Sequence, residues 1–255
     1  MAEKRRLDVL LHESGLAESR QRAQSTIMSG AVFVDGRRVD KAGTQVEADA
    51  RIEVRGNPLP YVSRGGLKLE KALDVFHISL DGAVAADIGA STGGFTDCML
   101  QRGAARVYAV DVGYGQLAWR LLSDPRVVCL ERTNARYLTE AEVPQKLDFV
   151  SVDVSFISLK LIFPALRALL VPHGQVVCLI KPQFEAGREQ VGKKGVVRDP
   201  AVHLQVLERF LEHARLYDFS VKGIDFSPIK GPEGNIEYLG HLTVGAGLPC
   251  AHDLR

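Results

Sequence analysis

The sequence predicts an α/β fold, in which helices cover both faces of a parallel sheet, preceded by a small α+β domain. Two observations predict it. After residue 60, short apolar runs alternate with amphipathic helical stretches, the pattern of parallel strands joined by crossover helices. Before that point the elements are shorter, and prolines and a glycine at residues 56–60 interrupt both periodicities. We therefore expect four parts: a first domain at 1–55, a linker at 56–62, a second domain at 63–246 and a tail at 247–255.

The charge balance, the cysteine spacing and the apolar segments limit the kinds of ligand and the location that we expect for this protein. The chain has 32 Lys and Arg against 31 Asp and Glu, so a nucleic-acid surface must come from local clustering of basic residues. Its four cysteines have no C-x-x-C spacing, which is typical of reduced thiols and gives no pattern of metal ligands. No apolar segment follows the charged N-terminus, and the apolar stretch at 159–171 is too short to span a bilayer. We expect a soluble, cytoplasmic protein without a bound metal or a stable protein partner.

The first domain is expected to hold two short helices and several short strands. Apolar residues repeat with helical spacing near the start of the chain, and Ser19 can cap a second helix over 20–29. An alternating V-x-V leads into Asp35-Gly36, a strong hairpin turn. Further short strands are expected at 38–39, 45–46 and 51–54. Arginines recur in pairs between these elements, and on charge alone a solvated surface is the simpler interpretation of them.

The second domain opens with a helix whose apolar face is Leu69, Leu73 and Phe76. The strands expected after it lie at 83–88, 106–110, 127–130, 149–154, 175–180, 219–224 and 237–244. Helices are expected between them at 95–102, 116–122, 159–170 and 200–216. Because ligands in such sheets bind outside the carboxyl ends of the strands, the residues at those ends are the candidates for function.

The first of these strands runs into a glycine-rich turn and a helix start, in the stretch AVAADIGASTGG at 83–94. Glycines allow a tight turn and bring free backbone N–H groups close to a ligand. Asp111 ends the second strand and follows Gly89 by about 20 positions, the spacing of an acid that binds ribose hydroxyls. The pattern therefore favours a nucleoside-type ligand over a loop acid or a helix cap.

A dinucleotide-binding enzyme and a hydrolase could each use a turn of this kind. Dinucleotide-binding turns prefer G-x-G-x-x-G, whereas this turn has one glycine in its tightest part. The residues also match G-x-S-x-G, the nucleophile elbow of hydrolases, with Ser91 as nucleophile and Asp153 with His203 or His241 as partners. That elbow normally follows several strands of its sheet, whereas this turn follows the first. We therefore disfavour both interpretations.

S-adenosylmethionine is the third ligand that the turn could hold. A flexible turn can cover its methionine part, while Asp111 binds the ribose and Asp87 lies near the amino group. Four further charges are expected at the same edge of the sheet: Lys68, Asp153, Lys181 and Glu237. Glu237 begins the last strand, so it reaches this edge if that strand is antiparallel. Any one of these residues could belong to a structural ion pair, but the set favours a catalytic site.

This set of charges resembles the K-D-K-E tetrad of FtsJ-type RNA ribose 2′-O-methyltransferases. The chain is still more similar to the TlyA family, in which an αL RNA-binding domain precedes such a methyltransferase. The motifs that carry the resemblance span nearly the whole chain: VSRGG-x-K (62–68), DIGASTGGFTD (87–97), AVDVGYGQLAW (109–119), LERTNAR (130–136), DVSFISL (153–159), IKPQFE (180–185), GVVRDP (195–200) and SPIKGPEGNIEY (227–238).

The resemblance implies a Rossmann-like S-adenosylmethionine methyltransferase sheet with a small N-terminal α+β αL RNA-binding domain. It also implies 2′-O-methylation of a cytidine ribose in ribosomal RNA, of the large subunit in shorter family members and of both subunits in longer ones. A ribosome-binding module with an inert methyltransferase fold is the alternative. Many members bear the name haemolysin, so a lytic protein is a further alternative, which no membrane-spanning or secreted feature of the sequence supports.

The resemblance assigns roles residue by residue. Lys181 is expected to deprotonate or polarise the ribose hydroxyl, with Asp153 and Glu237 orienting Lys181 and Lys68. The residues expected at the cofactor are Asp87, Gly89, Ser91, Gly93, Asp111 and Asn134. The residues expected to contact RNA are Arg5, Arg6, Arg20, Arg22, Arg37, Arg64, Arg188 and Lys193. Arg188 and Lys193 belong to a glycine-rich basic segment that is either a surface loop or a rim of the site.

Overall fold

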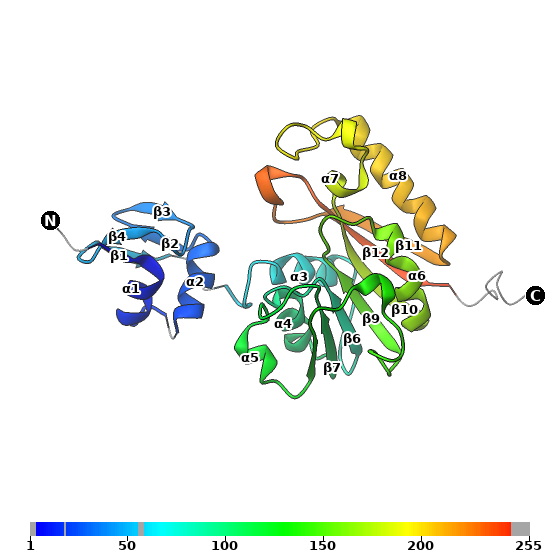
Figure 1. Ribbon diagram of the computed structural model, residues 1–255, viewed down its shortest axis with the longest axis horizontal. Helices are drawn as coiled ribbons and strands as arrows, with labels where there is room; N and C mark the ends of the chain where they lie inside the picture. The colour runs from blue at the N-terminus through cyan, green and yellow to red at the C-terminus, as the bar shows by residue number, and fades with distance from the viewer. Residues whose placement is uncertain (1–3, 18, 56–58, 246–255) are drawn as a thin grey trace, which may run out of the picture. The chain divides into compact units, whose positions relative to one another are not determined.

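A computed structural model describes residues 4–17, 19–55 and 59–245. The chain divides into two compact units, one up to Gly66 and the other from Leu67 (Figure 1). Of the linker that the sequence predicts, residues 56–58 lie outside the described residues, as does the predicted tail at 247–255.

The first unit combines two helices with two small sheets. Its helices are α1 (Leu7–Glu13) and α2 (Arg20–Met28). Strand β2 (Val32–Val34) lies between β3 (Arg37–Val39) and β5 (Ile52–Val54), and β1 (Lys4–Arg6) pairs with β4 (Gln45–Glu47). Apolar side chains of both helices and of the strands form one core: Leu7, Leu10, Leu11, Ala17, Ala23, Ile27, Val32, Val34 and Val46.

The structure of this unit confirms the predicted helix cap and hairpin turn, and it contains one strand that the sequence does not predict. The Ser19 hydroxyl accepts a hydrogen bond from the Arg22 amide, which confirms the predicted helix cap. Asp35 and Gly36 both have positive φ, as a two-residue hairpin turn requires. The missed strand is β1, whose sequence Lys-Arg-Arg has no strand pattern and becomes extended through its antiparallel pairing with β4.

The second unit alternates strands and helices along the chain. Its helices are α3 (Gly66–Val75), α4 (Gly94–Gln101), α5 (Trp119–Leu122), α6 (Phe163–Leu169), α7 (Pro182–Glu185) and α8 (Pro200–Leu216). Its strands are β6 (Val84–Ile88), β7 (Arg106–Val110), β8 (Val127–Leu130), β9 (Leu147–Val152), β10 (Leu170–Ile180), β11 (Phe219–Phe226) and β12 (Tyr238–Val244). Short 3₁₀ turns lie at Ala135–Tyr137, Leu159–Leu161, Arg188–Gln190 and Pro232–Gly234.

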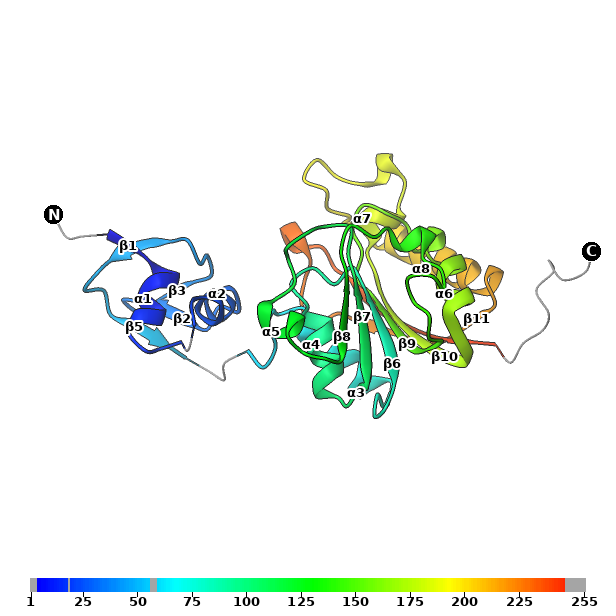
Figure 2. The same ribbon diagram turned by 60° about the horizontal axis from the view of Figure 1, so that its bottom comes forward.

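The strands form one seven-stranded sheet in the order β11-β12-β10-β9-β6-β7-β8. Strand β12 runs antiparallel to both of its neighbours, while the other paired strands are parallel. Helices cover both faces of the sheet, with α3 and α4 on one face and α6 and α8 on the other (Figures 1 and 2). This confirms the predicted α/β fold and corrects the parallel sheet to a mixed one. Because β12 is antiparallel, its beginning lies at the carboxyl ends of the parallel strands.

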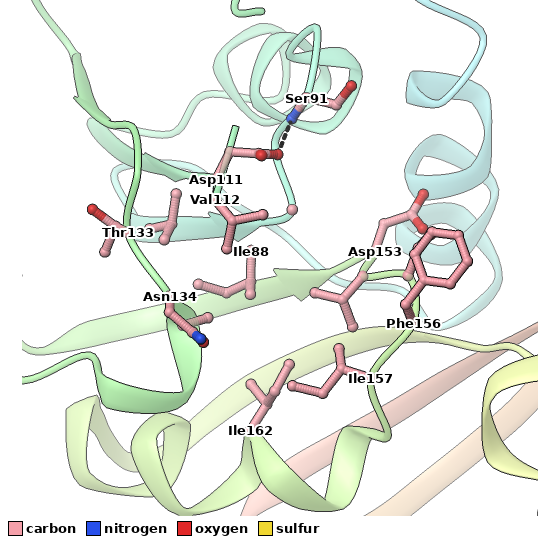
Figure 3. A pocket seen from close by; sticks show the side chains of 15 residues that line it. Ile88, Ser91, Asp111, Val112, Thr133, Asn134, Asp153, Phe156, Ile157 and Ile162 are labelled. Carbon is pink, nitrogen blue, oxygen red and sulfur yellow. Dashed lines mark hydrogen bonds between the residues drawn. The ribbon is translucent and has the colours of Figure 1, made fainter. Parts of the chain in front are cut away.

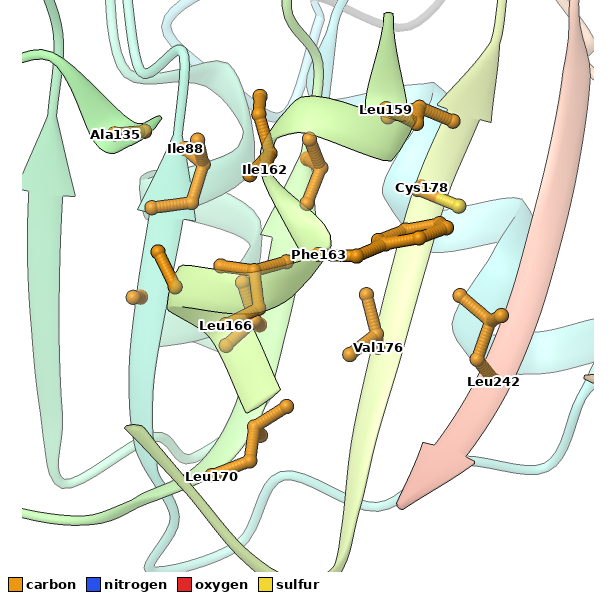
Figure 4. Close-up of a cluster of buried hydrophobic side chains, with 14 of the residues drawn as sticks. Ile88, Ala135, Leu159, Ile162, Phe163, Leu166, Leu170, Val176, Cys178 and Leu242 are labelled. Carbon is orange, nitrogen blue, oxygen red and sulfur yellow. The ribbon is translucent and has the colours of Figure 1, made fainter. Parts of the chain in front are cut away.

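The sheet is apolar on both faces because helices bury both. On β9, Val150 and Val152 belong to the core cluster that also contains Phe163 and Leu166 of α6 (Figure 4). The intervening Ser151 points to the opposite face, where its hydroxyl donates a hydrogen bond to the Asp87 carboxylate. Successive residues of a strand point to opposite faces, so two buried faces give a nearly continuous apolar run rather than a polar–apolar alternation.

Some predicted boundaries differ from the structure. The helix predicted at 159–170 is divided into a 3₁₀ turn and α6, which has Pro164 in its first turn. Proline has no backbone N–H to donate to the preceding turn, so the helix restarts there. No helix within the described ranges is both long and apolar enough to cross a membrane.

Candidate active site

The glycine-rich turn after β6 needs a residue without a side chain at its first position. Gly89 has a φ of +86°, and a Cβ there would collide with the backbone carbonyl of Asp153. Gly93, which directly precedes α4, also has a positive φ, and a Cβ there would collide with the Leu121 side chain of α5. The turn can therefore lie close to the end of β9, and this leaves Ser91 at its tip.

Asp87 is buried beneath this turn. Its Oδ2 accepts hydrogen bonds from the amide (2.8 Å) and hydroxyl (2.7 Å) of Thr96, and its Oδ1 accepts one from the Ser151 hydroxyl (3.2 Å). Burial raises the pKa of the Asp87 carboxyl to about 7. In this structure the carboxyl joins β6, β9 and the first turn of α4.

A cavity of about 420 Å³ opens at the ends of β6, β7 and β9. Four of the predicted cofactor residues line it: Gly89, Ser91, Asp111 and Asn134. Asp87 and Gly93 are not among its lining residues. Figure 3 shows Ser91 and Asp111 at one side of the cavity, and Ile157 and Ile162 at the opposite side.

The polar groups of the cavity are held by backbone contacts. Asp111 accepts hydrogen bonds from the amides of Ser91 (2.8 Å) and Gly113 (2.7 Å). Asn134 accepts one from the Arg136 amide (3.1 Å), which fixes the orientation of its carboxamide. The cavity therefore presents a carboxylate and an amide that are already oriented.

The sequence did not single out several residues that line this cavity, including Val112, Thr133, Phe156 and Ile157. Val112 directly follows the strand-end acid and is 70 % exposed, and Phe156 is 91 % exposed. The sequence could have suggested Val112 and Thr133, because they are adjacent to the predicted cofactor residues Asp111 and Asn134. Exposed apolar side chains around a cavity suit a flat ring rather than a charged ligand.

The structure brings the four predicted charges together beside this cavity. Lys68 Nζ lies 2.8 Å from Glu237 Oε2 and 3.6 Å from Asp153 Oδ2. Lys181 Nζ lies 2.5 Å from Asp153 Oδ1 and 3.3 Å from the Ser155 hydroxyl. Acids and lysines therefore alternate in the order Glu237, Lys68, Asp153 and Lys181. We call these four residues the lysine–acid cluster.

Each member of the lysine–acid cluster comes from a different element. Lys68 lies on α3, Asp153 and Lys181 directly follow β9 and β10, and Glu237 directly precedes β12. The two lysine side chains are 11 % and 9 % exposed, whereas that of Asp153 is 20 % exposed and lines the cavity. Asp153 is thus shared between the cavity and the cluster.

The hydrolase interpretation of Ser91 is contradicted by its surroundings. The Ser91 hydroxyl donates to Gln116 rather than to a histidine. His203 is buried between the Tyr238 hydroxyl and the Val197 carbonyl, and His241 contacts Gln175. Neither histidine can take a proton from Ser91.

The predicted RNA-contacting arginines of the first unit have different surroundings. Arg6 and Arg20 both donate to Asp8, with Arg6 binding both carboxylate oxygens. Asp8 is fully buried, while the Arg6 and Arg20 side chains are 44 % and 53 % exposed. The arginines, Arg6 above all, hold the pKa of the Asp8 carboxyl well below its usual range. Arg5 instead pairs with Glu13.

The remaining predicted RNA contacts lie on separate elements. Arg22 is in the first turn of α2, Arg37 is on β3, and Arg64 is exposed shortly before α3. Arg188 and Lys193 are exposed in the segment between α7 and α8. In the part of the chain that the structure describes, no three His, Cys, Asp or Glu side chains are grouped as metal ligands.

Comparison with known proteins agrees with this arrangement. Residues 61–243 match the family FtsJ-like methyltransferase, and residues 5–52 match the S4 domain. The chain is 46 % identical over 239 residues to "16S/23S rRNA (cytidine-2'-O)-methyltransferase TlyA" of Mycobacterium tuberculosis, covering 93 % of this chain and 89 % of that protein. The chain belongs to the TlyA family.

Two more proteins are similar to most of this chain. The first, "Putative rRNA methyltransferase YqxC" of Bacillus subtilis, is 57 % identical over 242 residues, covering 94 % of this chain and 86 % of that protein. The second is a solved structure, "Putative hemolysin from Streptococcus thermophilus", with 52 % identity and a TM-score of 0.76, covering 96 % of this chain and 90 % of that one. As in the TlyA family, an S4 domain here precedes a Rossmann-like methyltransferase sheet.

Proposed function

We propose that this chain transfers a methyl group from S-adenosylmethionine to the 2′-hydroxyl of a cytidine ribose in ribosomal RNA. The observation that carries the proposal is that Asp153 both lines the cavity and contacts Lys68 and Lys181. A cofactor site and a pair of lysines thereby share one carboxylate. The name of the Mycobacterium tuberculosis relative supports cytidine in ribosomal RNA as the substrate.

The cavity fits the proposed cofactor in its chemistry. Asp111 would accept hydrogen bonds from the ribose hydroxyls, since a carboxylate has about four acceptor positions and two are occupied. The Asn134 carboxamide would donate to an adenine nitrogen, and Val112 and Ile162 would pack on the faces of the ring. Gly89 and Ser91 would contact the methionine part. When bound, S-adenosylmethionine supplies an electrophilic methyl group on a sulfonium.

Lys181 is our candidate for activating the hydroxyl. A ribose hydroxyl is a weak nucleophile at neutral pH, so it needs a group that removes or polarises its proton. Asp153 and Ser155 hold the Lys181 amine beside the cavity, and in its neutral form this amine would take the proton as the ribose oxygen bonds to the methyl carbon and the carbon–sulfur bond breaks. Correct positioning supplies much of the rate, because the methyl group is already activated.

Lys68 and Glu237 would act through the other two members of the cluster. Lys68 contacts the Asp153 oxygen that Lys181 does not use, and Glu237 holds Lys68 at 2.8 Å. This arrangement fixes Asp153 and leaves its other oxygen for Lys181. We therefore assign Lys68 and Glu237 to orientation of the Asp153–Lys181 pair.

The first unit would supply affinity for RNA. Its arginines can bind backbone phosphates, which positions a protein on RNA without reading sequence. Arg6 and Arg20 are partly exposed and held in place by Asp8, so they are the strongest of the predicted contacts. We propose ribosomal RNA as the partner, and therefore a cytoplasmic location.

The test is tritiated methyl transfer to purified ribosomal subunits, followed by mass mapping of ribose methylation in each RNA. Lys181→Ala should lower the rate by about 10²–10⁴-fold while leaving cofactor affinity by calorimetry unchanged. The matched control is Lys160→Ala, an exposed lysine of the 3₁₀ turn at 159–161.

Two outcomes would contradict the proposal. Full activity of Lys181→Ala would remove Lys181 from the chemistry. An unmodified ribose in both subunits, with RNA binding and cofactor binding intact, would instead favour the inert ribosome-binding module.

A further inference from the structure

The segment between α7 and α8 is a basic loop, which we define as residues 187–199. It contains four cations, Arg188, Lys193, Lys194 and Arg198, against the two acids Glu189 and Asp199. All four cations are exposed. One of the acids, Asp199, is already engaged in capping α8, because it accepts a hydrogen bond from the Ala201 amide. The loop therefore offers excess positive charge.

A single buried carboxamide holds the far end of this loop. Asn235 is 4 % exposed. Its Oδ1 accepts a hydrogen bond from the Val197 amide (3.2 Å), and its Nδ2 donates one to the Gly195 carbonyl (2.9 Å). A carboxamide is suited to this position because it can accept and donate at once.

A histidine completes the attachment. His203 Nε2 lies 3.0 Å from the Val197 carbonyl, and its Nδ1 lies 2.8 Å from the Tyr238 hydroxyl. Both backbone groups of Val197 are thus paired, one with Asn235 and one with His203. Val197 itself is buried, so the chain is fixed between Lys194 and Arg198.

Asn235, which anchors the loop, is also close in sequence to Glu237 of the lysine–acid cluster. Asn235 lies two positions before Glu237, and its carbonyl accepts a hydrogen bond from the Gly231 amide (2.9 Å). The Glu237 carbonyl accepts one from the Ser227 amide (2.9 Å), while its carboxylate holds Lys68. One short, well-bonded segment therefore fixes both the basic loop and a member of the cluster.

We propose that Asn235 is a positioning residue that holds the basic loop as a contact for RNA backbone phosphates at a fixed place relative to the lysine–acid cluster. This inference rests on the proposed function. Phosphate contacts set the register of a nucleic acid on a protein, so a loop that is already held in place favours binding of the RNA in one register. A loop that is anchored beside Glu237 would deliver the ribose to Lys181 in one register.

The first experiment separates anchoring from chemistry. Asn235→Ala should raise the KM for ribosomal RNA about tenfold, leave kcat at saturating RNA and cofactor affinity nearly unchanged, and accelerate trypsin cleavage after Lys193 and Lys194. Asn235→Asp keeps the acceptor for Val197 but loses the donor to Gly195, so it should give intermediate values. It also serves if the alanine variant fails to fold.

Gln175→Ala is the matched control. Gln175 is a carboxamide of the same unit that is hydrogen-bonded to a histidine, His241, away from the basic loop. This control should lower thermal stability without changing the KM for RNA or the cleavage after Lys193 and Lys194. An equal KM change in both variants would show a merely structural role and overturn the proposal.

The second experiment is a double-mutant cycle on RNA affinity, measured by filter binding so that it does not depend on methylation. Lys193→Ala with Lys194→Ala should weaken RNA binding about tenfold in the parent chain and less than about threefold in the Asn235→Ala background. Additive effects, or no effect in the parent, would overturn the proposal. If methylation is absent but the coupling is present, the proposed function has failed and the anchored RNA contact stands.

Discussion

Asp8 in one unit and Asp153 in the other each lie between two basic side chains. In the S4 unit, Asp8 accepts hydrogen bonds from Arg6 and Arg20. In the methyltransferase unit, Asp153 contacts Lys68 and Lys181. The carboxylate is fully buried in the first case and the arginines are about half exposed, whereas in the second case the lysines are buried and the carboxylate faces a cavity.

This difference follows the chemistry of the two cations. Arginine keeps its charge at every physiological pH and has several N–H groups, so a buried acid can hold the side chain in place while its positive charge stays available to phosphate. Lysine is a compact ammonium that can exchange its proton. The first arrangement is therefore suited to binding and the second to chemistry.

Exchanging the cation in the lysine–acid cluster should have the largest effect. Lys181→Arg keeps the positive charge next to Asp153 but introduces a group that does not release a proton near neutral pH. We expect single-turnover methyl transfer to fall by about 10²-fold or more, with cofactor affinity retained. Lys160→Arg is the control. Substantial activity in Lys181→Arg would show that positive charge alone suffices at this position and that lysine is not needed as a base.

Removing the buried carboxylate of the S4 unit should have an intermediate effect. Asp8→Asn removes the negative charge and one of the two acceptor oxygens that Arg6 and Arg20 bind, and it should lower the free energy of unfolding of this unit by about 1–3 kcal/mol. RNA affinity should fall even though the net positive charge rises. Hydrogen exchange of the α1 and α2 amides in the full chain and filter binding measure the two effects.

Asp8→Asn should also change how the stability of the S4 unit depends on pH. Because the arginines lower the pKa of Asp8 in the folded chain, its stabilisation is present above the unfolded-state pKa of about 4 and is lost as pH falls through the folded-state value. The parent S4 unit should therefore lose stability in acid more steeply than Asp8→Asn. Parallel acid curves would show that Asp8 does not carry this stabilisation.

Exchanging the cation in the S4 unit should have the smallest effect. Arg20→Lys keeps a point charge for phosphate, so RNA affinity should fall by no more than about threefold and the salt dependence should be unchanged. Arg20→Ala should lower the slope of log Kd against log salt by about 1. A loss in Arg20→Lys as large as in Arg20→Ala would mean that the fork geometry, rather than the charge, binds the RNA.

Much of the site could be predicted because it lies at strand ends. Asp111, Asp153 and Lys181 each directly follow an apolar run, and parallel strands bring such positions to one edge. Asp87 shows the limit of this reasoning. It lies within the same apolar run as Ile88, but its direction is set by strand alternation, which places it under α4 among Thr96 and Ser151 rather than in the cavity.

The sequence by itself determined the α/β order of elements, the glycine turn and the strand-end charges, because these depend on periodicity and on residues close together in the chain. Tertiary structure alone decided the pairing of β1 with β4, the antiparallel place of β12 and the convergence of Arg6 and Arg20 on Asp8. It also decided the two hydrogen bonds by which Asn235 fixes the basic loop. These contacts join residues far apart in the chain, and their partners are selected by packing and by the need to pair every buried polar group.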